Sequence, residues 1–404
     1  MNIHHKHAEI RVHGGKIWKW WRLIAKRLVW LALHALWIMP VNRRKIYFSS
    51  YRGLQYSCNP RYLYEHLVHT GLVSKYKIVW ELRSGAGNDM PLQPVVVAPR
   101  TLRGVVECMT ARYIVTNAEF PWWIPLRRGQ VLLQTWHGGG AYKKVGLEVG
   151  WGRLVDYEIK LNSRQITFYV SSCRKFTEIQ SRSKCVPEKK FLPTGMPRNS
   201  FLLNQDKLIQ RRLRQKIGIG GEDRILLYAP TYRGEPRRRR GGGDAGGELL
   251  DFARLRRCVT RRFGGCWTVL CRGHYFAVGA FDGCGADIQD MSDHDDMQEL
   301  LYIADILVTD FSSSMWDFSL LYRPCFLFAP DVDSYNCGRG FYTPPASWPF
   351  PLARSNQELE SVITAFDTDK YVADVRRHHE ELGSYEGCNS PALILKAIGL
   401  EDDE

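Results

Sequence analysis

The sequence lacks the cysteine patterns of a zinc site or a disulfide scaffold. Its eleven cysteines are scattered and odd in number, with no CxxC pair and no zinc-like Cys/His spacing. We therefore expect reduced thiols, mostly buried, as in cytosolic proteins. A GxSxG nucleophile elbow is also missing, which excludes lipase-type chemistry.

No hydrophobic run is long enough to predict a membrane span. The cleanest apolar run, Leu28 to Met39, has twelve residues and includes His34, whereas a span needs about 20. Pro40 is followed closely by Asn42-Arg43-Arg44-Lys45 instead of a small-residue cleavage site. Export through a cleaved signal peptide is therefore not expected.

Acidic residues are almost absent from the first 60 positions, which hold eleven Lys or Arg and one acid, Glu9. This stretch carries +10 of the net charge of +14, so the remaining 344 residues carry only +4. The basic character thus belongs to the N-terminal segment and not to the whole surface.

The segment from Lys16 to Pro40 has the pattern of an amphipathic helix. Six apolar residues share one face and three basic residues another: Ile17, Trp20, Trp21, Ile24, Leu28 and Leu31 against Lys19, Arg22 and Lys26. This composition is typical of a helix in a membrane interface that is attracted to anionic lipid. A transmembrane helix and a buried core helix are the alternatives.

After Pro40, strand-like runs alternate with helix-like stretches, which predicts βαβ units and a parallel sheet. The pattern restarts after residue 205. We expect an α/β protein with two Rossmann-like, doubly wound domains facing a cleft, preceded by a basic membrane-associating segment: residues 1–40, 41–205 and 206–404. The strands are expected at 45–50, 76–82, 111–118, 129–138, 224–231, 266–273, 304–310 and 324–331, and helices at 61–70, 101–110, 249–262, 297–303 and 314–321.

Residues that could carry chemistry come directly after these strands. Trp136-His137-Gly138-Gly139-Gly140 follows an apolar strand, so His137 could act as a general base beside glycine amides that bind an anion. A tight turn with an incidental histidine explains the same residues.

Three further strand ends are polar. Pro230-Thr231 would leave the Thr231 hydroxyl and amide free for a base or phosphate, and Arg272-Gly273-His274 would suit a phosphate. Ser312-Ser313 should cap the next helix, whose exposed amides bind phosphate. Surface turns and simple capping are the alternatives.

Asp317 lies four residues after Ser313, on the same helical face. A carboxylate repels a diphosphate, so this residue would suit the hydroxyls of a ribose or polyol, or would complement the helix dipole.

Taken in order, these pieces resemble the CDP-glycerol glycerophosphotransferase family, the teichoic-acid type polymerases and primases. The resemblance covers about residues 45 to 345 and rests on QTWHG, LPTGMPRNS, LLYAPTYR, RGHY, ADILVTDFSS with Asp317, and RGFY, together with YFSSYRGLQYSCNPRYLYEHL and ARYIVTNAEFP. One departure stands out: Gly139 and Gly140 replace the threonine and proline of the family's HGTP.

The resemblance implies a GT-B architecture and transfer of a polyol phosphate from CDP-glycerol, or another CDP-polyol, with release of CMP. It implies that His137 and His274 are essential and that the donor lies on Trp136, Gly138, Gly139, Gly140, Arg198, Pro230, Thr231, Arg272, Gly273, Ser312, Ser313 and Asp317. No metal or other cofactor is expected.

The acceptor implied is a lipid-linked saccharide or polyol-phosphate chain of undecaprenyl type at the cytoplasmic face of the membrane. Glycerol or ribitol donor, and primase or polymerase activity, remain open. A GT-B glycosyltransferase using a nucleotide sugar is the nearest alternative. A non-enzymatic basic protein that binds membrane or nucleic acid is another, although no nucleic-acid partner is expected.

Overall fold

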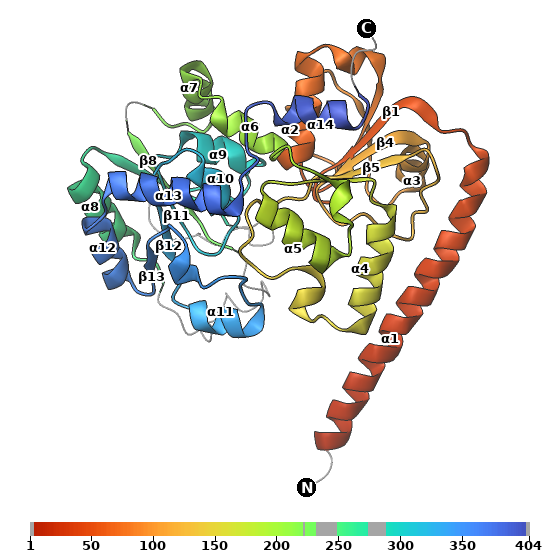
Figure 1. Ribbon diagram of the computed structural model, residues 1–404, viewed down its shortest axis with the longest axis horizontal. Coiled ribbons are helices and arrows are strands. Elements are labelled where there is room, and N and C mark those ends of the chain that lie inside the picture. Colours follow the sequence, from red (N-terminus) through yellow and green to blue (C-terminus); the bar gives the residue numbers. More distant parts are fainter. Residues whose placement is uncertain (1–3, 221–222, 232–248, 274–287, 401–404) are drawn as a thin grey trace.

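The fold is described by a computed structural model, which covers residues 4–220, 223–231, 249–273 and 288–400. Its elements surround two parallel β-sheets, one in each half of the molecule (Figure 1). We call residues 42–203 the N-terminal half and residues 207–382 the C-terminal half. The expected α/β class with parallel sheets is confirmed.

The N-terminal half holds a seven-stranded sheet in the order β3-β2-β1-β4-β5-β6-β7. Its central strands are apolar and buried along most of their length, as strands covered by helices on both faces must be. The strands are β1 (Asn42–Ser49), β2 (Lys77–Glu81), β3 (Val95–Val97), β4 (Ala111–Thr116), β5 (Val131–Gln134), β6 (Phe168–Val170) and β7 (Phe191–Leu192).

The C-terminal half holds a six-stranded parallel sheet in the order β10-β9-β8-β11-β12-β13. In both sheets the order reverses beside the first strand, which makes a crevice at the carboxyl ends of the strands. The strands are β8 (Arg224–Ala229), β9 (Trp267–Cys271), β10 (Ile288–Asp290), β11 (Ile306–Thr309), β12 (Cys325–Phe328) and β13 (Leu352–Ala353).

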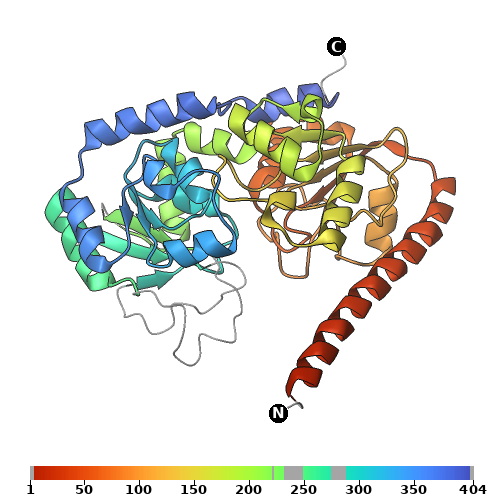
Figure 2. The same cartoon turned by 60° about the horizontal axis from the view of Figure 1, so that its bottom comes forward.

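Helices cover both sheets, as Figures 1 and 2 show. They are α2 (Cys58–His69), α3 (Leu102–Met109), α4 (Arg153–Gln165), α5 (Arg174–Lys184), α6 (Pro197–Leu203), α7 (Lys207–Lys216), α8 (Phe252–Phe263), α9 (Met297–Ile303), α10 (Ser314–Ser319), α11 (Val332–Gly338), α12 (Asn356–Thr364), α13 (Thr368–Leu382) and α14 (Ser390–Ala397).

The eight strands and five helices expected from the sequence are present, with bounds that differ by a few residues. The strands not expected are β3, β6, β7, β10 and β13, which have only two or three residues each. Such short strands show no hydrophobic period, and the strands beside them decide that they pair.

The C-terminal helices cross from one half to the other. The chain leaves the second sheet and continues through α13 into α14, which contacts α2 and α6 of the N-terminal half. Figure 2 shows these helices in blue along the upper edge of the molecule.

The N-terminal helix α1 (His4–Leu33) stands away from the body over much of its length (Figure 1). Lys26 forms an ion pair with Glu158 of α4, and Arg27 donates a hydrogen bond to Tyr157 of the same helix. Within the described ranges, no helix is both long and apolar enough to span a membrane.

Candidate active site

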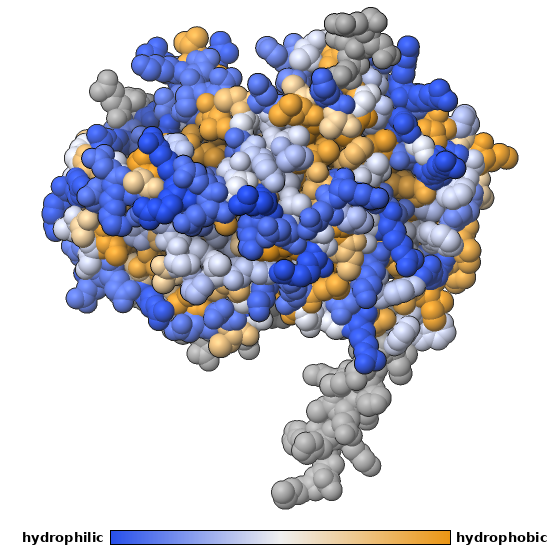
Figure 3. Space-filling view, in the orientation of Figure 1, coloured by the Kyte–Doolittle hydropathy of each residue, from blue (hydrophilic) through white to orange (hydrophobic). Residues whose placement is uncertain are grey.

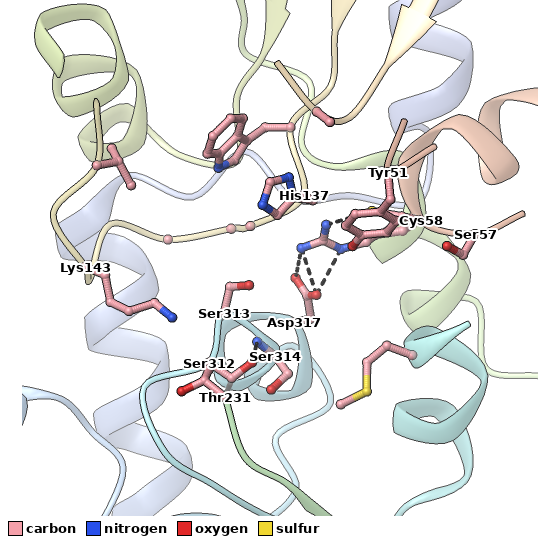
Figure 4. A pocket seen from close by; sticks show the side chains of 18 of the residues that line it. Tyr51, Ser57, Cys58, His137, Lys143, Thr231, Ser312, Ser313, Ser314 and Asp317 are labelled. Carbon is pink, nitrogen blue, oxygen red and sulfur yellow. Dashed lines mark hydrogen bonds and ion pairs between the residues drawn. The ribbon is translucent and has the colours of Figure 1, made fainter. Parts of the chain in front are cut away.

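A cavity of about 1040 Å³ lies between the two halves, at the carboxyl ends of both sets of strands. Every predicted site residue that the structure describes lines it: Trp136, His137, Gly138, Gly139, Gly140, Arg198, Pro230, Thr231, Arg272, Gly273, Ser312, Ser313 and Asp317. His274 lies outside the described residues. Figure 4 shows His137 and Ser313 from opposite halves facing the same space.

His137 is positioned by the end of the neighbouring strand. Its Nδ1 lies 2.7 Å from the carbonyl oxygen of Asn117, which follows β4. Because a carbonyl only accepts, Nδ1 must carry the hydrogen, and Nε2 is the atom that can accept a proton. Burial, reinforced by nearby cations such as Arg198, lowers the pKa of His137 to about 4. The imidazole is therefore neutral near pH 7, as a general base must be.

The three glycines after His137 leave room for parts of the C-terminal half. A Cβ at Gly138 would lie 3.3 Å from Ser313, and one at Gly139 only 2.0 Å from Cδ1 of Trp316. Gly140 has φ +64°, and its Cβ would lie 2.4 Å from the ring of Tyr142 in the same loop and 3.0 Å from Cε3 of Trp316. Trp316 thus explains why no side chain stands at position 139.

The loop that begins at His137 is hydrogen-bonded to the C-terminal half. The amide of Lys144 donates to the carbonyl of Gly340 at 3.1 Å, and the amide of Tyr342 donates to the carbonyl of Tyr142 at 2.9 Å. The motif RGFY therefore anchors the far end of the glycine loop.

The carboxylate of Asp317 is hydrogen-bonded to other side chains of the protein. Arg198 forms a fork with its two carboxylate oxygens at 2.9 and 3.0 Å, and Gln298 donates to it at 2.9 Å. Both members of the ion pair are buried. The expectation that this carboxylate meets substrate hydroxyls needs correction: its first partner is Arg198, which it orients and holds charged.

Thr231 also differs from expectation. Its amide donates to Asp310 at 2.9 and 3.0 Å, and its hydroxyl donates to the same carboxylate at 2.8 Å. The prediction that this amide and hydroxyl are free was wrong, because Asp310, which directly follows β11, binds both. Pro230 and Thr231 nevertheless line the cavity.

The Arg272 and Gly273 turn is likewise held by protein atoms. Nη2 of Arg272 donates to the carbonyls of His294 and Asp295 at 2.9 and 3.1 Å, and the amide of Gly273 donates to Ser292 at 2.9 Å. These contacts fix the guanidinium at the cavity wall.

The serine turn contains one residue that the sequence argument did not select. Ser314 begins α10 and lines the cavity beside Ser312 and Ser313 (Figure 4). Its hydroxyl oxygen is buried and has no hydrogen-bond partner within the described part of the chain. An unsatisfied hydroxyl at this place is a candidate donor to a ligand oxygen.

Backbone strain marks five residues of the cavity, and of these only Trp136 was selected from the sequence. Among the described non-glycine residues with positive φ, five line this cavity: Tyr51, Arg52, Cys58, Arg100 and Trp136. Strain of this kind collects at functional sites. Tyr51 and Arg52 directly follow the strand expected at 45–50, whereas no strand was expected directly before Cys58 or Arg100.

The sequence profile of one family matches residues 31–399, and its description is CDP-Glycerol:Poly(glycerophosphate) glycerophosphotransferase. This chain belongs to that family. A teichoic acid poly(glycerol phosphate) polymerase of Bacillus spizizenii is 29% identical over 397 residues, which are 95% of this chain and 99% of that protein. A teichoic acid glycerol-phosphate transferase of Staphylococcus aureus is 29% identical over 371 residues, covering 88% of this chain and 93% of the relative.

Solved structures agree with this family assignment. The wall teichoic acid polymerase TagF, in a structure soaked with CDPG, superposes with a TM-score of 0.76 at 25% identity, covering 89% of each chain. The fold is therefore TagF-like and of GT-B type, with parallel sheets on both sides of the cavity.

Proposed function

We propose that this cavity transfers glycerol phosphate from CDP-glycerol to a polyol-phosphate or lipid-linked saccharide acceptor in teichoic acid synthesis, with release of CMP. The observation that carries the proposal is the shared cavity: a neutral imidazole from one half faces the serine turn of the other, in a chain that belongs to this family.

In the proposed reaction the acceptor hydroxyl oxygen attacks the β-phosphorus of CDP-glycerol. The bond from that phosphorus to the bridging oxygen breaks, and CMP leaves with the bonding electrons. Nε2 of His137 takes the hydroxyl proton. Arg198, Arg272 and the turn at Ser312-Ser313 stabilise the phosphate charge, because phosphoryl transfer depends mainly on positioning and electrostatics.

The remaining assignments complete the donor site. Pro230 and Thr231 form the wall near the cytidine, and Trp136 with Gly138, Gly139 and Gly140 forms the wall beside the diphosphate. Gly273 holds Arg272 in place, and His274 is kept as a second essential histidine on the resemblance alone. Asp317 acts on the donor through Arg198. The donor can be CDP-glycerol or another CDP-polyol.

We infer that residues 1–40 attach the enzyme peripherally to the cytoplasmic face of the membrane, where an undecaprenyl-type acceptor would lie. Trp20 and Trp21 on α1 are 56% and 63% exposed, and Ile38 in the turn that follows is 90% exposed. Hydrophobic side chains gather along this edge of the molecule in Figure 3. Residues 41–205 and 206–404 are proposed as the acceptor-side and donor-side domains.

The test is CMP release from CDP-glycerol by His137→Ala. Loss of a positioned base should lower kcat by about 10² to 10⁴. His69→Ala, on the exposed end of α2, is the matched control and should keep wild-type activity. Folding of both variants is checked by circular dichroism, and a folded His137→Ala enzyme with most of its activity would refute the assigned role.

A further inference from the structure

Two arginines lie on the rim that the N-terminal half contributes to the cavity. Arg52 follows β1 and Arg100 follows β3; both side chains are exposed and both residues line the cavity. Their φ angles are 59° and 61°, a left-handed conformation that is costly for a side chain of this kind.

The two loops that carry these arginines touch each other. A Cβ at Gly53 would lie 2.5 Å from Cγ of Pro99, so the residue after Arg52 packs directly on the residue before Arg100. The amide of Arg83 also donates to the carbonyl of Gly53 at 2.8 Å. The strained backbone is therefore held by contacts on both sides.

The same arginine rim is tied to the candidate base. Asn117 accepts the amide of Tyr51 on its side-chain oxygen at 2.7 Å, and its carbonyl accepts Nδ1 of His137 at 2.7 Å. The rings of Tyr51 and His137 have centroids 5.5 Å apart. Arg52 is thus the next residue after a side chain that contacts the imidazole.

The acid near these arginines is already paired with another cation. Glu119, an acid on this side of the cavity, is ion-paired with the buried Lys184. Burial alone would raise the pKa of Glu119. Lys184 and, more weakly, Arg52 outweigh burial and hold this pKa below its ordinary value. Within the described ranges, neither Arg52 nor Arg100 has a side-chain hydrogen bond or ion pair.

We propose that Arg52 and Arg100 form a subsite for a phosphodiester of the acceptor. This rests on the proposed function: when the C-terminal half holds the donor diphosphate, the acceptor hydroxyl has to reach His137 from the N-terminal side. A polyol-phosphate chain carries its first phosphate only a few bonds from the terminal hydroxyl, and a guanidinium binds phosphate oxygens as a fork.

The experiment measures two binding constants separately by calorimetry, with soluble poly(glycerol phosphate) and with CDP-glycerol. The double variant Arg52→Ala/Arg100→Ala should weaken polymer binding by about tenfold or more, because two charge-assisted contacts are lost. CDP-glycerol binding should stay within about twofold. Arg211→Ala/Arg212→Ala, at two exposed positions of α7, removes the same charge elsewhere and should change neither constant.

Each other outcome overturns the proposal. If the double variant bound both ligands more weakly to the same extent, the arginines would belong to the donor site. If polymer binding were unchanged, or if the wild type did not bind the polymer, there would be no such subsite. A loss of sedimentation with phosphatidylglycerol vesicles, without a loss of polymer binding, would assign the arginines to lipid headgroups. If the wild type released no CMP from CDP-glycerol, the proposed function would be rejected. The polymer-binding measurement would still decide on the subsite, because binding requires no turnover.

Discussion

Position 139 has room for a hydrogen atom and nothing larger. Trp316 fills the place where a side chain would stand, and its Nε1 donates to Glu386 at 2.9 Å. Glu386 also accepts the amide of Met196 and the side chain of Asn199. The half-buried side chain of Glu386 thus holds the indole against the glycine loop. The geometry around His137 therefore depends on Trp316, which is 179 positions away.

Gly139→Ala should therefore reduce kcat strongly, because a Cβ at 2.0 Å from Trp316 must displace either the loop or the indole. Adding Trp316→Leu to this variant should restore part of the loss by making room. Steady-state kinetics of CMP release measure both. Gly220→Ala, where a Cβ meets nothing within 4 Å, should behave as wild type. Equal activity of Gly139→Ala and wild type would contradict this packing.

The depressed pKa of His137 predicts an unusual pH profile. A base with a pKa of about 4 is deprotonated at all higher pH values, so kcat/KM should stay level from pH 8 down to about 5 and fall only below that. Burial raises the pKa of Glu386 to about 7, so its titration could appear in the same range. Glu386→Gln removes that titration and serves as the control. An acid limb centred near 6.5 in both proteins would contradict the prediction.

Among the elements, α2 and α9 hold the two halves together. Arg61 on α2 binds Asp296, which caps α9, at 3.2 Å and Glu299 of α9 at 2.7 Å. Glu299 also lies 2.9 Å from His294. Burial alone would raise the pKa of Glu299, but His294 and Arg61 outweigh burial and lower this pKa to about 2. Glu299 therefore stays charged across the physiological pH range, and Arg61 ties both acids to α2.

Arg61→Ala should lower the free energy of unfolding by about 3 kcal/mol, because it removes the guanidinium that Asp296 and Glu299 share and leaves Glu299 with His294 and Lys216 alone. Urea unfolding followed by fluorescence measures the shift of the midpoint. Arg254→Ala removes a more exposed ion pair with Glu360 and should have little effect. Similar shifts in both variants would show that burial does not determine the strength of the α2–α9 contact.

At the scale of the whole molecule, α1 places aromatic side chains outside the globular body. The exposed side chains Trp20, Trp21, Leu28 and Leu31 all belong to this helix. Its ion pair between Lys26 and Glu158 shows that one predicted basic residue serves to dock the helix on α4. The apolar residues are therefore the better target for a test of membrane attachment.

Trp20→Ala/Trp21→Ala should reduce sedimentation with anionic vesicles by about tenfold or more, because two interfacial aromatic anchors are lost. Leu208→Ala/Leu393→Ala, at apolar positions that are 60% and 48% exposed, is the control and should bind like wild type. Added salt should weaken binding further, because it screens the attraction to anionic lipid. Unchanged sedimentation of the tryptophan variant would reject the membrane role of α1.

The sequence by itself determined the local features: the long apolar strands, the helices between them and the polar motifs after each strand. Because parallel strands end at one edge, these motifs could be expected at a single cavity, and the structure places the described ones there. The short strands β3 and β13 were not predicted, because only their pairing with neighbouring strands defines them.

Only the tertiary structure decided which partners these residues have. Three contacts show this, and each joins residues that are 79 or more positions apart: Arg198 with Asp317, Thr231 with Asp310, and Trp316 with Gly139. Local pattern specifies which face of an element is buried, but it carries no information on which distant side chain lies opposite. Such pairings arise when two sheets and their loops pack, and they determine whether a predicted polar group is available to a ligand or already satisfied within the protein.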